Sequence, residues 1–180
     1  MGIVTLATWK KYARKPDDDA AGEALYQTFL DAAETIVEEH LGFDPVSQTY
    51  TAQALVGTGF DSLQLKAKPI TVLTSVSVDG VLRTVADFLI EGERITDKNG
   101  LIFPAGSAVL CTYTAGYATI PALISLTIMD IASLLSMNQG DNIGVSSVTF
   151  DGGNTRQFIN YNTFAKQLSR LANIRLVRAS

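Results

Sequence analysis

The spacing of apolar residues changes twice along the chain. Apolar residues recur at helical spacing over residues 5–14 and again from about residue 20 to 41. Between 47 and 114 the pattern becomes a series of short alternating or β-branched runs, cut by Gly and Pro. Helical spacing returns at 121–138 and at 161–172. The pattern therefore predicts an α+β fold with helices on both sides of an antiparallel β region.

The second helix has the clearest boundaries in the sequence. Asp17, Asp18 and Asp19 precede it and supply both a capping oxygen and negative charge at the positive end of the helix dipole. Gly42 follows Leu41 and is suited to the left-handed conformation that ends a helix. The spacing predicts that this helix buries a face made of Leu25, Phe29, Ala32, Ile36 and Val37.

The stretch VLCTYTAGYATIPALISLTIMDIASLL, residues 109–135, joins a predicted strand to an almost wholly apolar helix. Gly116 allows the turn between them, and Pro121 is suited to the first turn of a helix. Apolar side chains cover most of the helix circumference, so the helix is expected in the centre of the fold or at a subunit interface. The expected core or subunit-interface residues are Tyr113, Gly116, Tyr117, Pro121, Leu123, Ile128, Ile131 and Leu135.

These patterns predict a helical core with an inserted antiparallel β region. The core would consist of two N-terminal helices, a long apolar central helix and a C-terminal helix. The insertion would occupy about residues 47–114, with turns at Asp79-Gly80 and Asn99-Gly100. Asp130 is the one acidic residue of the apolar helix. Either it is buried with a hydrogen-bonding or cationic partner, or it faces solvent on a narrow polar strip with Thr127 and Ser133.

Composition narrows the possible functions. A chain of 180 residues with 47% hydrophobic and 18% charged residues is suited to one globular domain. One cysteine, Cys111, and one histidine, His40, exclude an intramolecular disulfide and a Cys/His metal cluster, so no metal or cofactor is expected. No window is apolar enough to predict a membrane span, and no signal peptide is predicted.

Candidate catalytic groups are weak in this sequence. His40 is the only imidazole and lies at the end of an acidic helix, which favours a surface role. GTGFDS, residues 57–62, lies among strands without a following helix and is interpreted as a loop. Asp87, Glu91 and Glu93 are close together, but Gly92 favours a turn, and the three are interpreted as solvated acids. The sequence therefore predicts no enzyme activity.

Charge is distributed unevenly along the chain. Residues 17–44 hold nine acids and no Lys or Arg, whereas the side chains after Asp151 include five basic and no acidic groups. Such asymmetry favours either complementary contacts between copies or partners, or simply a solvated acidic helix face and a basic tail. A net charge of −4 and a sequence pI of about 4.9 argue against nucleic-acid binding by a broad basic patch.

Four segments, taken in order, resemble the head-tail connector, or adaptor, family of tailed bacteriophages. They are EEHLG at the end of the acidic helix, KPITVLTSVSVDG at 68–80, DFLIEGERI at 87–95 and VLCTYTAGYATIPALI at 109–124. The junction from YTAGY to the Pro-initiated helix is the most specific of them. The resemblance covers residues 5–135 most strongly and the remainder by its order of elements.

The resemblance implies a structural, non-enzymatic protein of the virion neck, assembled in the bacterial host cytoplasm. It implies one adaptor domain over 1–180 that forms a ring of twelve copies, docks on the portal protein after genome packaging and provides the platform for a stopper or tail-side protein. Genome DNA would pass through the ring without being bound specifically. A C-terminal extension at 173–180 would reach the portal, with Ile174, Arg175, Leu176, Val177 and Arg178 as contact residues.

Other functions remain alternatives at this stage. Another neck component, such as a stopper or tail-completion protein, is the nearest, although those proteins generally lack the leading pair of helices. A small β-rich ligand-binding module is the second, but its candidate aromatics, Tyr50, Phe60, Phe88 and Phe103, are scattered. A hydrolase using Asp87, Glu91 or Asp130 is the weakest, because it would lack a base, a metal site and a phosphate loop.

Overall fold

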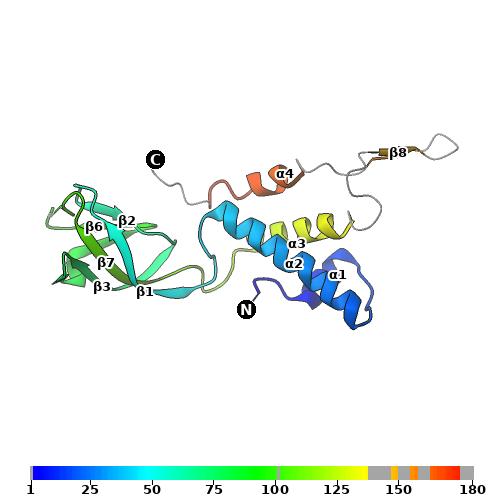
Figure 1. The fold of residues 1–180 in the computed structure, drawn as a ribbon, viewed down its shortest axis with the longest axis horizontal. Helices are drawn as coiled ribbons and strands as arrows, with labels where there is room; N and C mark the ends of the chain where they lie inside the picture. The colour runs from blue at the N-terminus through cyan, green and yellow to red at the C-terminus, as the bar shows by residue number, and fades with distance from the viewer. Residues whose placement is uncertain (1, 101, 138–146, 150–154, 158–162, 175–180) are drawn as a thin grey trace. The chain divides into compact units, whose positions relative to one another are not determined.

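The computed structural model describes residues 2–100, 102–137, 147–149, 155–157 and 163–174 (Figure 1). The chain divides into two compact units. The helical unit lies within Met1–Leu41 and Ile120–Arg175, and the β unit lies within Gly42–Thr119. Each unit has its own buried residues and is described by itself.

In the helical unit, α3 is in contact with each of the other three helices. Helix α3 packs along α2, and α1 and α4 each contact α3 (Figure 1). The fully buried side chains of this unit are mainly aliphatic, as expected for helices that pack through apolar stripes. The helices are α1 (Leu6–Ala13), α2 (Ala20–Leu41), α3 (Ala122–Met137) and α4 (Thr163–Ser169).

Local sequence accounts for the ends of the first two helices. Thr5 caps α1, where its Oγ1 accepts a 3.2 Å hydrogen bond from the backbone N–H of Thr8. The predicted capping of α2 by the aspartate triplet is confirmed for Asp19, whose Oδ1 accepts a 2.9 Å hydrogen bond from the N–H of Gly22. The face that α2 buries differs from the prediction. Its buried residues are Leu30, Ala33, Val37 and Leu41, whereas Leu25 is exposed.

The predicted architecture, a helical core with a long central helix, is wrong, although the α+β composition agrees with the structure. Helix α3 has 16 residues and is shorter than the 22-residue α2. The helices of the described chain are short and are accompanied by a β unit with antiparallel sheets of its own. Apolar residues around most of a helix show that its neighbours cover most of its sides. In this unit α1, α2 and α4 cover the 16-residue α3, so a long central helix is not needed to explain the apolar pattern.

The β unit contains two antiparallel sheets. One has the strand order β1-β7-β3-β4 and the other the order β2-β6-β5. The N–H of Ile70, in β3, donates a 2.9 Å hydrogen bond to the carbonyl of Gly92 in the β5–β6 turn, which connects the two sheets. The strands are β1 (Gln48–Val56), β2 (Ser62–Gln64), β3 (Ile70–Val78), β4 (Val81–Arg83), β5 (Phe88–Glu91), β6 (Arg94–Asp97) and β7 (Ala108–Ala115), with a 3-10 turn η1 (Val85–Asp87) before β5.

Turn chemistry fixes the hairpins of the β unit. The predicted turn at Asp79-Gly80 is confirmed, because both residues have positive φ, 49° and 80°, and they join the paired strands β3 and β4. Between α3 and α4 in the sequence, β8 (Ser147–Thr149) and β9 (Thr155–Gln157) pair antiparallel. In the part of the chain that the structure describes, no helix is long and apolar enough to span a membrane.

Candidate functional site

Asp130 on α3 holds three helices of the helical unit together. Its Oδ1 accepts a 2.6 Å hydrogen bond from the Tyr12 hydroxyl on α1, and its Oδ2 lies 2.8 Å from Nη1 of Arg170, directly after α4. The side chain of Asp130 is 21% exposed and that of Arg170 is 40% exposed. The hydrogen bond to the carboxylate raises the pKa of Tyr12. Asp130 therefore has both a hydrogen-bonding and a cationic partner, as the first interpretation expected, although its side chain is half-buried rather than buried.

Trp9 makes a second link between α1 and α3. Its side chain is fully buried, and its Nε1–H points at both the carbonyl of Met129, at 3.2 Å, and Oγ of Ser133, at 3.1 Å. The ring also lies edge-on against Tyr26 of α2, with centroids 5.8 Å apart. Ser133, which one of the two interpretations placed on a solvent-facing polar strip, thus faces a tryptophan inside the helical unit.

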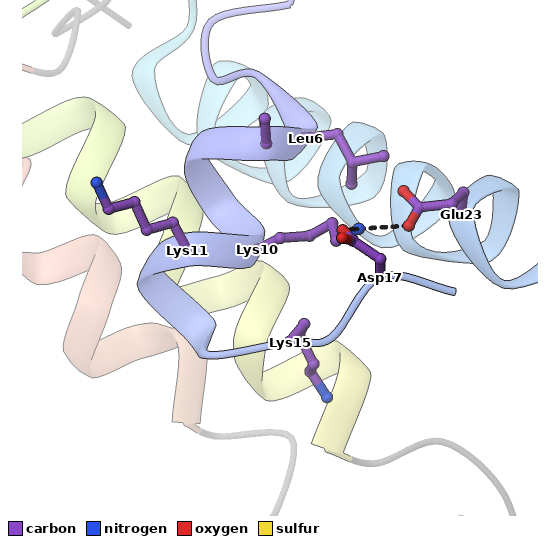
Figure 2. A pocket seen from close by; sticks show the side chains of 7 residues that line it. Leu6, Lys10, Lys11, Lys15, Asp17 and Glu23 are labelled. Carbon is purple, nitrogen blue, oxygen red and sulfur yellow. Dashed lines mark hydrogen bonds and ion pairs between the residues drawn. The ribbon is translucent and has the colours of Figure 1, made fainter. Parts of the chain in front are cut away.

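A hollow beside α1 is lined by charged side chains (Figure 2). Lys10 is buried, and its ammonium lies between the carboxylates of Asp17, at 2.7 Å, and Glu23. Hydrogen bonds to Asp17 and then Glu23 raise the pKa of Lys10, and the same contacts lower the pKa of both acids. Figure 2 shows Lys11 and Lys15 pointing away from this ion pair.

The charged side chains of this hollow have a structural role. A lysine whose pKa is raised stays protonated near neutral pH, so Lys10 cannot act as a general base or as a Schiff-base nucleophile. Its two carboxylate partners are occupied by the ammonium. Glu23 also accepts a 3.1 Å hydrogen bond from the N–H of Asp18, so the cluster holds the segment between α1 and α2 against the start of α2.

The start and the end of the β unit run side by side at Gly116. The N–H of Tyr117 donates a 2.8 Å hydrogen bond to the carbonyl of Pro45, and the N–H of Gly116 donates a 3.0 Å hydrogen bond to the carbonyl of Pro69. Gly116 has a φ of 105°, and a Cβ at this position would lie 2.5 Å from the carbonyl oxygen of Val46. Glycine is therefore required both by the backbone conformation and by the close approach of the entering chain.

The interior of the β unit contains two polar groups that burial keeps protonated. Tyr113 is fully buried, stacks on Tyr50 at 5.1 Å between centroids and donates a hydrogen bond from its hydroxyl to Oε1 of Gln53. Burial raises the pKa of Tyr113 to about 12 and that of the Cys111 thiol to about 11. A thiol with such a pKa is a poor nucleophile, so Cys111 acts as a small core residue.

The acidic candidates for catalysis do not assemble into a site. Asp87 ends η1, and Glu91 and Glu93 flank Gly92 in the β5–β6 turn. Glu93 is not simply solvated, because Oε2 lies 3.1 Å from Nζ of Lys68 and Oε1 accepts a 3.1 Å hydrogen bond from Nε2 of Gln64. Among the described residues no group of three His, Cys, Asp or Glu side chains could hold a metal ion.

The predicted core or interface residues differ in burial. Tyr113, Gly116, Ile128 and Ile131 are buried, Tyr117, Pro121 and Leu135 are half-buried, and Leu123 is 37% exposed. Of the predicted portal-contact residues, Ile174 is described and half-buried, and its N–H donates a 2.8 Å hydrogen bond to the carbonyl of Leu171. The others, Arg175, Leu176, Val177 and Arg178, lie outside the described residues.

Sequence reasoning missed the partners that make these clusters. The sequence indicated Tyr12 and Lys10 only as parts of an amphipathic helix, and Arg170 only as part of a basic tail. A signal for Asp130 did exist, because a lone carboxylate in an apolar helix requires a partner. Nothing in the spacing could select Tyr12 and Arg170, which are 118 and 40 residues away.

Comparison with known proteins shows what the fold is similar to. No protein-family model matches the chain, and no curated protein matches it. A chain of the neck of an empty gene transfer agent (GTA) particle, computed with C6 symmetry, has 19% identity and a TM-score of 0.64, over 99% of this chain and 92% of that chain.

Two further structures agree. A chain of the virion of a native GTA particle has 18% identity and a TM-score of 0.63, over 99% and 92% of the two chains. A chain of the neck of the native particle, computed with C12 symmetry, has 16% identity and a TM-score of 0.57, over 97% and 90%. The fold is therefore shared with chains of such particles.

Proposed function

We propose that this chain is a structural protein of a phage-like virion neck, and specifically a ring-forming head-to-tail adaptor. The supporting observation is the extent of the fold similarity, which spans 99% of this chain and 92% of a GTA neck chain. The similarity therefore includes both the helical unit and the β unit, and is not limited to one of them. The order of sequence segments that resembles the adaptor family supports the same function independently of the structure.

The adaptor would act as a ring of twelve identical copies. The similar chains come from necks computed with C6 and C12 symmetry, which supports repeated contacts around one axis. In such a ring each copy contacts its two neighbours through unlike surfaces, so no two-fold patch is needed. The exposed large apolar side chains found on both units, among them Leu123 and Leu110, supply surface for such contacts.

The portal would be bound through the C-terminal segment 173–180, and the stopper or tail-side protein through the opposite face of the ring. The chain just before this segment is well anchored. Leu171 is fully buried and Arg170 is paired with Asp130, so a basic and apolar tail would start from a fixed point on the helical unit. Anchoring supports a tail that docks into a partner, because less conformational entropy is lost on binding.

The clusters described above support a non-enzymatic role in the virion. Lys10, Asp130 and Glu93 are each engaged in ion pairs that hold segments of the chain together. Genome DNA would pass through the ring without specific contacts, in keeping with the acidic pI of 4.9. Assembly would take place in the bacterial host cytoplasm, without a membrane or a cofactor.

The test is the mass of the purified protein alone and after mixing with portal rings from the same genome. A ring formed alone, or capture by the portal in a fixed stoichiometry near one copy per portal subunit, is the expected result. The tail-side stopper should then bind to the portal-adaptor complex and not to the portal alone. A protein that stays monomeric and is not captured by the portal would refute the adaptor function.

A further inference from the structure

Strand β1 is an open edge of the four-stranded sheet. Among the described residues it pairs only with β7, on one of its two sides. Its nine residues, QTYTAQALV, contain no charged residue and no proline. Exposed edges usually carry Lys or Pro, or are kept very short, because an open edge otherwise pairs with other strands. A bulge between Tyr50 and Gln53 interrupts the first half of β1 only.

The hydrogen-bonding direction of Ala54 and Val56 follows from their partners in β7. Val56 lies opposite Ala108, but the backbone of Ala108 bonds away from β1: its carbonyl accepts a 2.8 Å hydrogen bond from the N–H of Asp79, and its N–H donates a 2.9 Å hydrogen bond to Oδ1 of Asp79. The pair Val56–Ala108 is therefore of the non-hydrogen-bonded kind. In an antiparallel ladder, hydrogen-bonded and non-hydrogen-bonded pairs alternate, so the pair Ala54–Leu110 is also non-hydrogen-bonded. Ala54 and Val56 therefore both direct their N–H and C=O groups away from β7.

Exposed apolar side chains lie on the sheet face next to this edge. Ala54, Leu110, Ser77 and Leu82 lie in register across β1, β7, β3 and β4, so their side chains share one face. Leu110 is 43% exposed and Leu82 is 71% exposed, and Val56, two residues along from Ala54, is 66% exposed. The opposite face carries Val76, Val109 and Cys111 and is buried. An added strand would both satisfy the edge and cover part of this row.

We propose that residues 53–56 of β1 bind an extended segment of a second copy of this chain by strand addition. The inference rests on the proposed ring, in which every copy must present two unlike surfaces that fit each other. Main-chain hydrogen bonds supply the affinity in strand addition, and alternate side chains supply specificity. An uncharged edge beside exposed apolar side chains is suited to a repeated contact between copies, because backbone hydrogen bonds and apolar burial can hold the contact together without paired charges.

The segment contributed by the second copy is not β1 itself. Pairing of β1 with β1 of another copy would create a two-fold dimer that uses the edge of both copies and closes on itself. Cyclic symmetry instead requires the edge of each copy to receive a different part of its neighbour. This requirement separates the proposal from non-specific edge-to-edge association.

Proline substitution at the edge tests the proposal. Ala54→Pro and Val56→Pro each remove an outward N–H that makes no backbone pairing within the described part of the chain, whereas Ala54→Ser keeps it. At the concentration where half of the unaltered protein is assembled on portal rings, each proline variant is expected to assemble at least tenfold less, and Ala54→Ser within twofold of the unaltered protein. Protection of the buried Cys111 thiol shows whether each variant has folded. Folded proline variants that assemble normally would overturn the inference and leave the adaptor function intact.

Cross-linking tests whether β1 contacts a second copy even if neither proline variant folds. In the Ala54→Cys variant, the introduced thiol is exposed and carries a benzophenone-maleimide label, whereas the buried Cys111 stays unlabelled. In the assembled ring this label is expected to form adducts with a second copy, at residues outside 48–56. Adducts confined to the same chain, to the portal, or to residues 48–56 of the second copy would each overturn the inference. Failure of the unaltered protein to assemble at all would refute the proposed function and the inference with it.

Discussion

Tyr12 and Asp130 are joined by a 2.6 Å hydrogen bond, although they are 118 residues apart and belong to α1 and α3. Arg170 reaches the other oxygen of the same carboxylate, so one side chain connects the first, third and fourth helices. The chain also carries one tryptophan, Trp9, in the helical unit, and one cysteine, Cys111, in the β unit. Trp9 fluorescence and Cys111 thiol reactivity therefore report on the two units separately.

Asp130→Ala is expected to lower the free energy of unfolding of the helical unit by about 1 kcal/mol. Hydrogen bonds to a charged group contribute more than this when buried, but Asp130 and Arg170 are partly exposed to water. Denaturant unfolding followed by Trp9 fluorescence measures the loss, and proteolysis should cut α4 sooner. Asp31→Ala is the matched control, because the side chain of Asp31 is exposed and, among the contacts described, accepts a hydrogen bond only from Gln27, one turn away. Equal effects of the two substitutions would contradict the proposed role of Asp130.

Gly116→Ala is expected to destabilise the β unit by about 3 kcal/mol. The added Cβ would lie 2.5 Å from the carbonyl oxygen of Val46, and the φ of 105° is unfavourable for alanine. Gly92→Ala is the control, because Gly92 also has a positive φ, 62°, but a Cβ there meets nothing within 4 Å; its expected cost is about 1 kcal/mol. The measurement is the denaturant concentration at which Cys111 becomes reactive, and similar midpoints for the two variants would argue against the close approach at Gly116.

Alkaline pH is expected to destabilise the β unit. Burial raises the pKa of Cys111 from 9.0 to about 11 and that of Tyr113 from 10.0 to about 12. Over these intervals the unfolded chain has lost protons that the folded chain retains, so stability falls as pH rises, by roughly 2 to 3 kcal/mol for each group. Unfolding measured between pH 8 and 11.5 should show this loss, and Tyr113→Phe should show a smaller one. The same slope in both proteins would exclude Tyr113 as a contributor.

Arg175→Glu is expected to weaken capture by the portal at least tenfold without affecting the folding of either unit. The substitution reverses charge in the segment proposed to contact the portal, and opposite charges across an interface control both encounter and register. Arg94→Glu makes the same change of charge at an exposed position in the β unit and should alter capture less than twofold. Co-sedimentation with portal rings compares the two variants. A greater loss of portal capture from Arg94→Glu than from Arg175→Glu would contradict the assignment of the portal contact to the C-terminal segment.

Several elements could be predicted because the signals that make them are local. Asp19 marks the start of α2 through a side-chain hydrogen bond, and Gly42 marks its end through a positive φ of 78°. Asp79-Gly80 makes the β3–β4 turn through its own positive φ values. The buried face of α2 could not be predicted in this way. Apolar and alanine residues occur on more than one side of that helix, so the stripe of Leu30, Ala33, Val37 and Leu41 was selected by packing against neighbouring helices.

The prediction of a long central helix failed for a related reason. The apolar pattern of 122–137 correctly indicated a covered helix, and Ile124, Ile128 and Ile131 are fully buried. Pattern alone does not show how many neighbours provide the cover. Here α1, α2 and α4 each contact α3, so much of its apolar surface is buried within the chain itself.

By itself, the sequence determined the α+β composition, most element boundaries, the turn residues and the absence of a Cys/His metal cluster, because each depends on residue type and near-neighbour spacing. Only the tertiary structure decided that Lys10 lies between Asp17 and Glu23 and that Asp130 contacts Tyr12 and Arg170. It also decided that β1 is an edge strand of its sheet among the described residues. The partners of Asp130 and the strand order join residues far apart in the chain. Contacts of that kind arise from the packing of the whole unit, which no local pattern encodes.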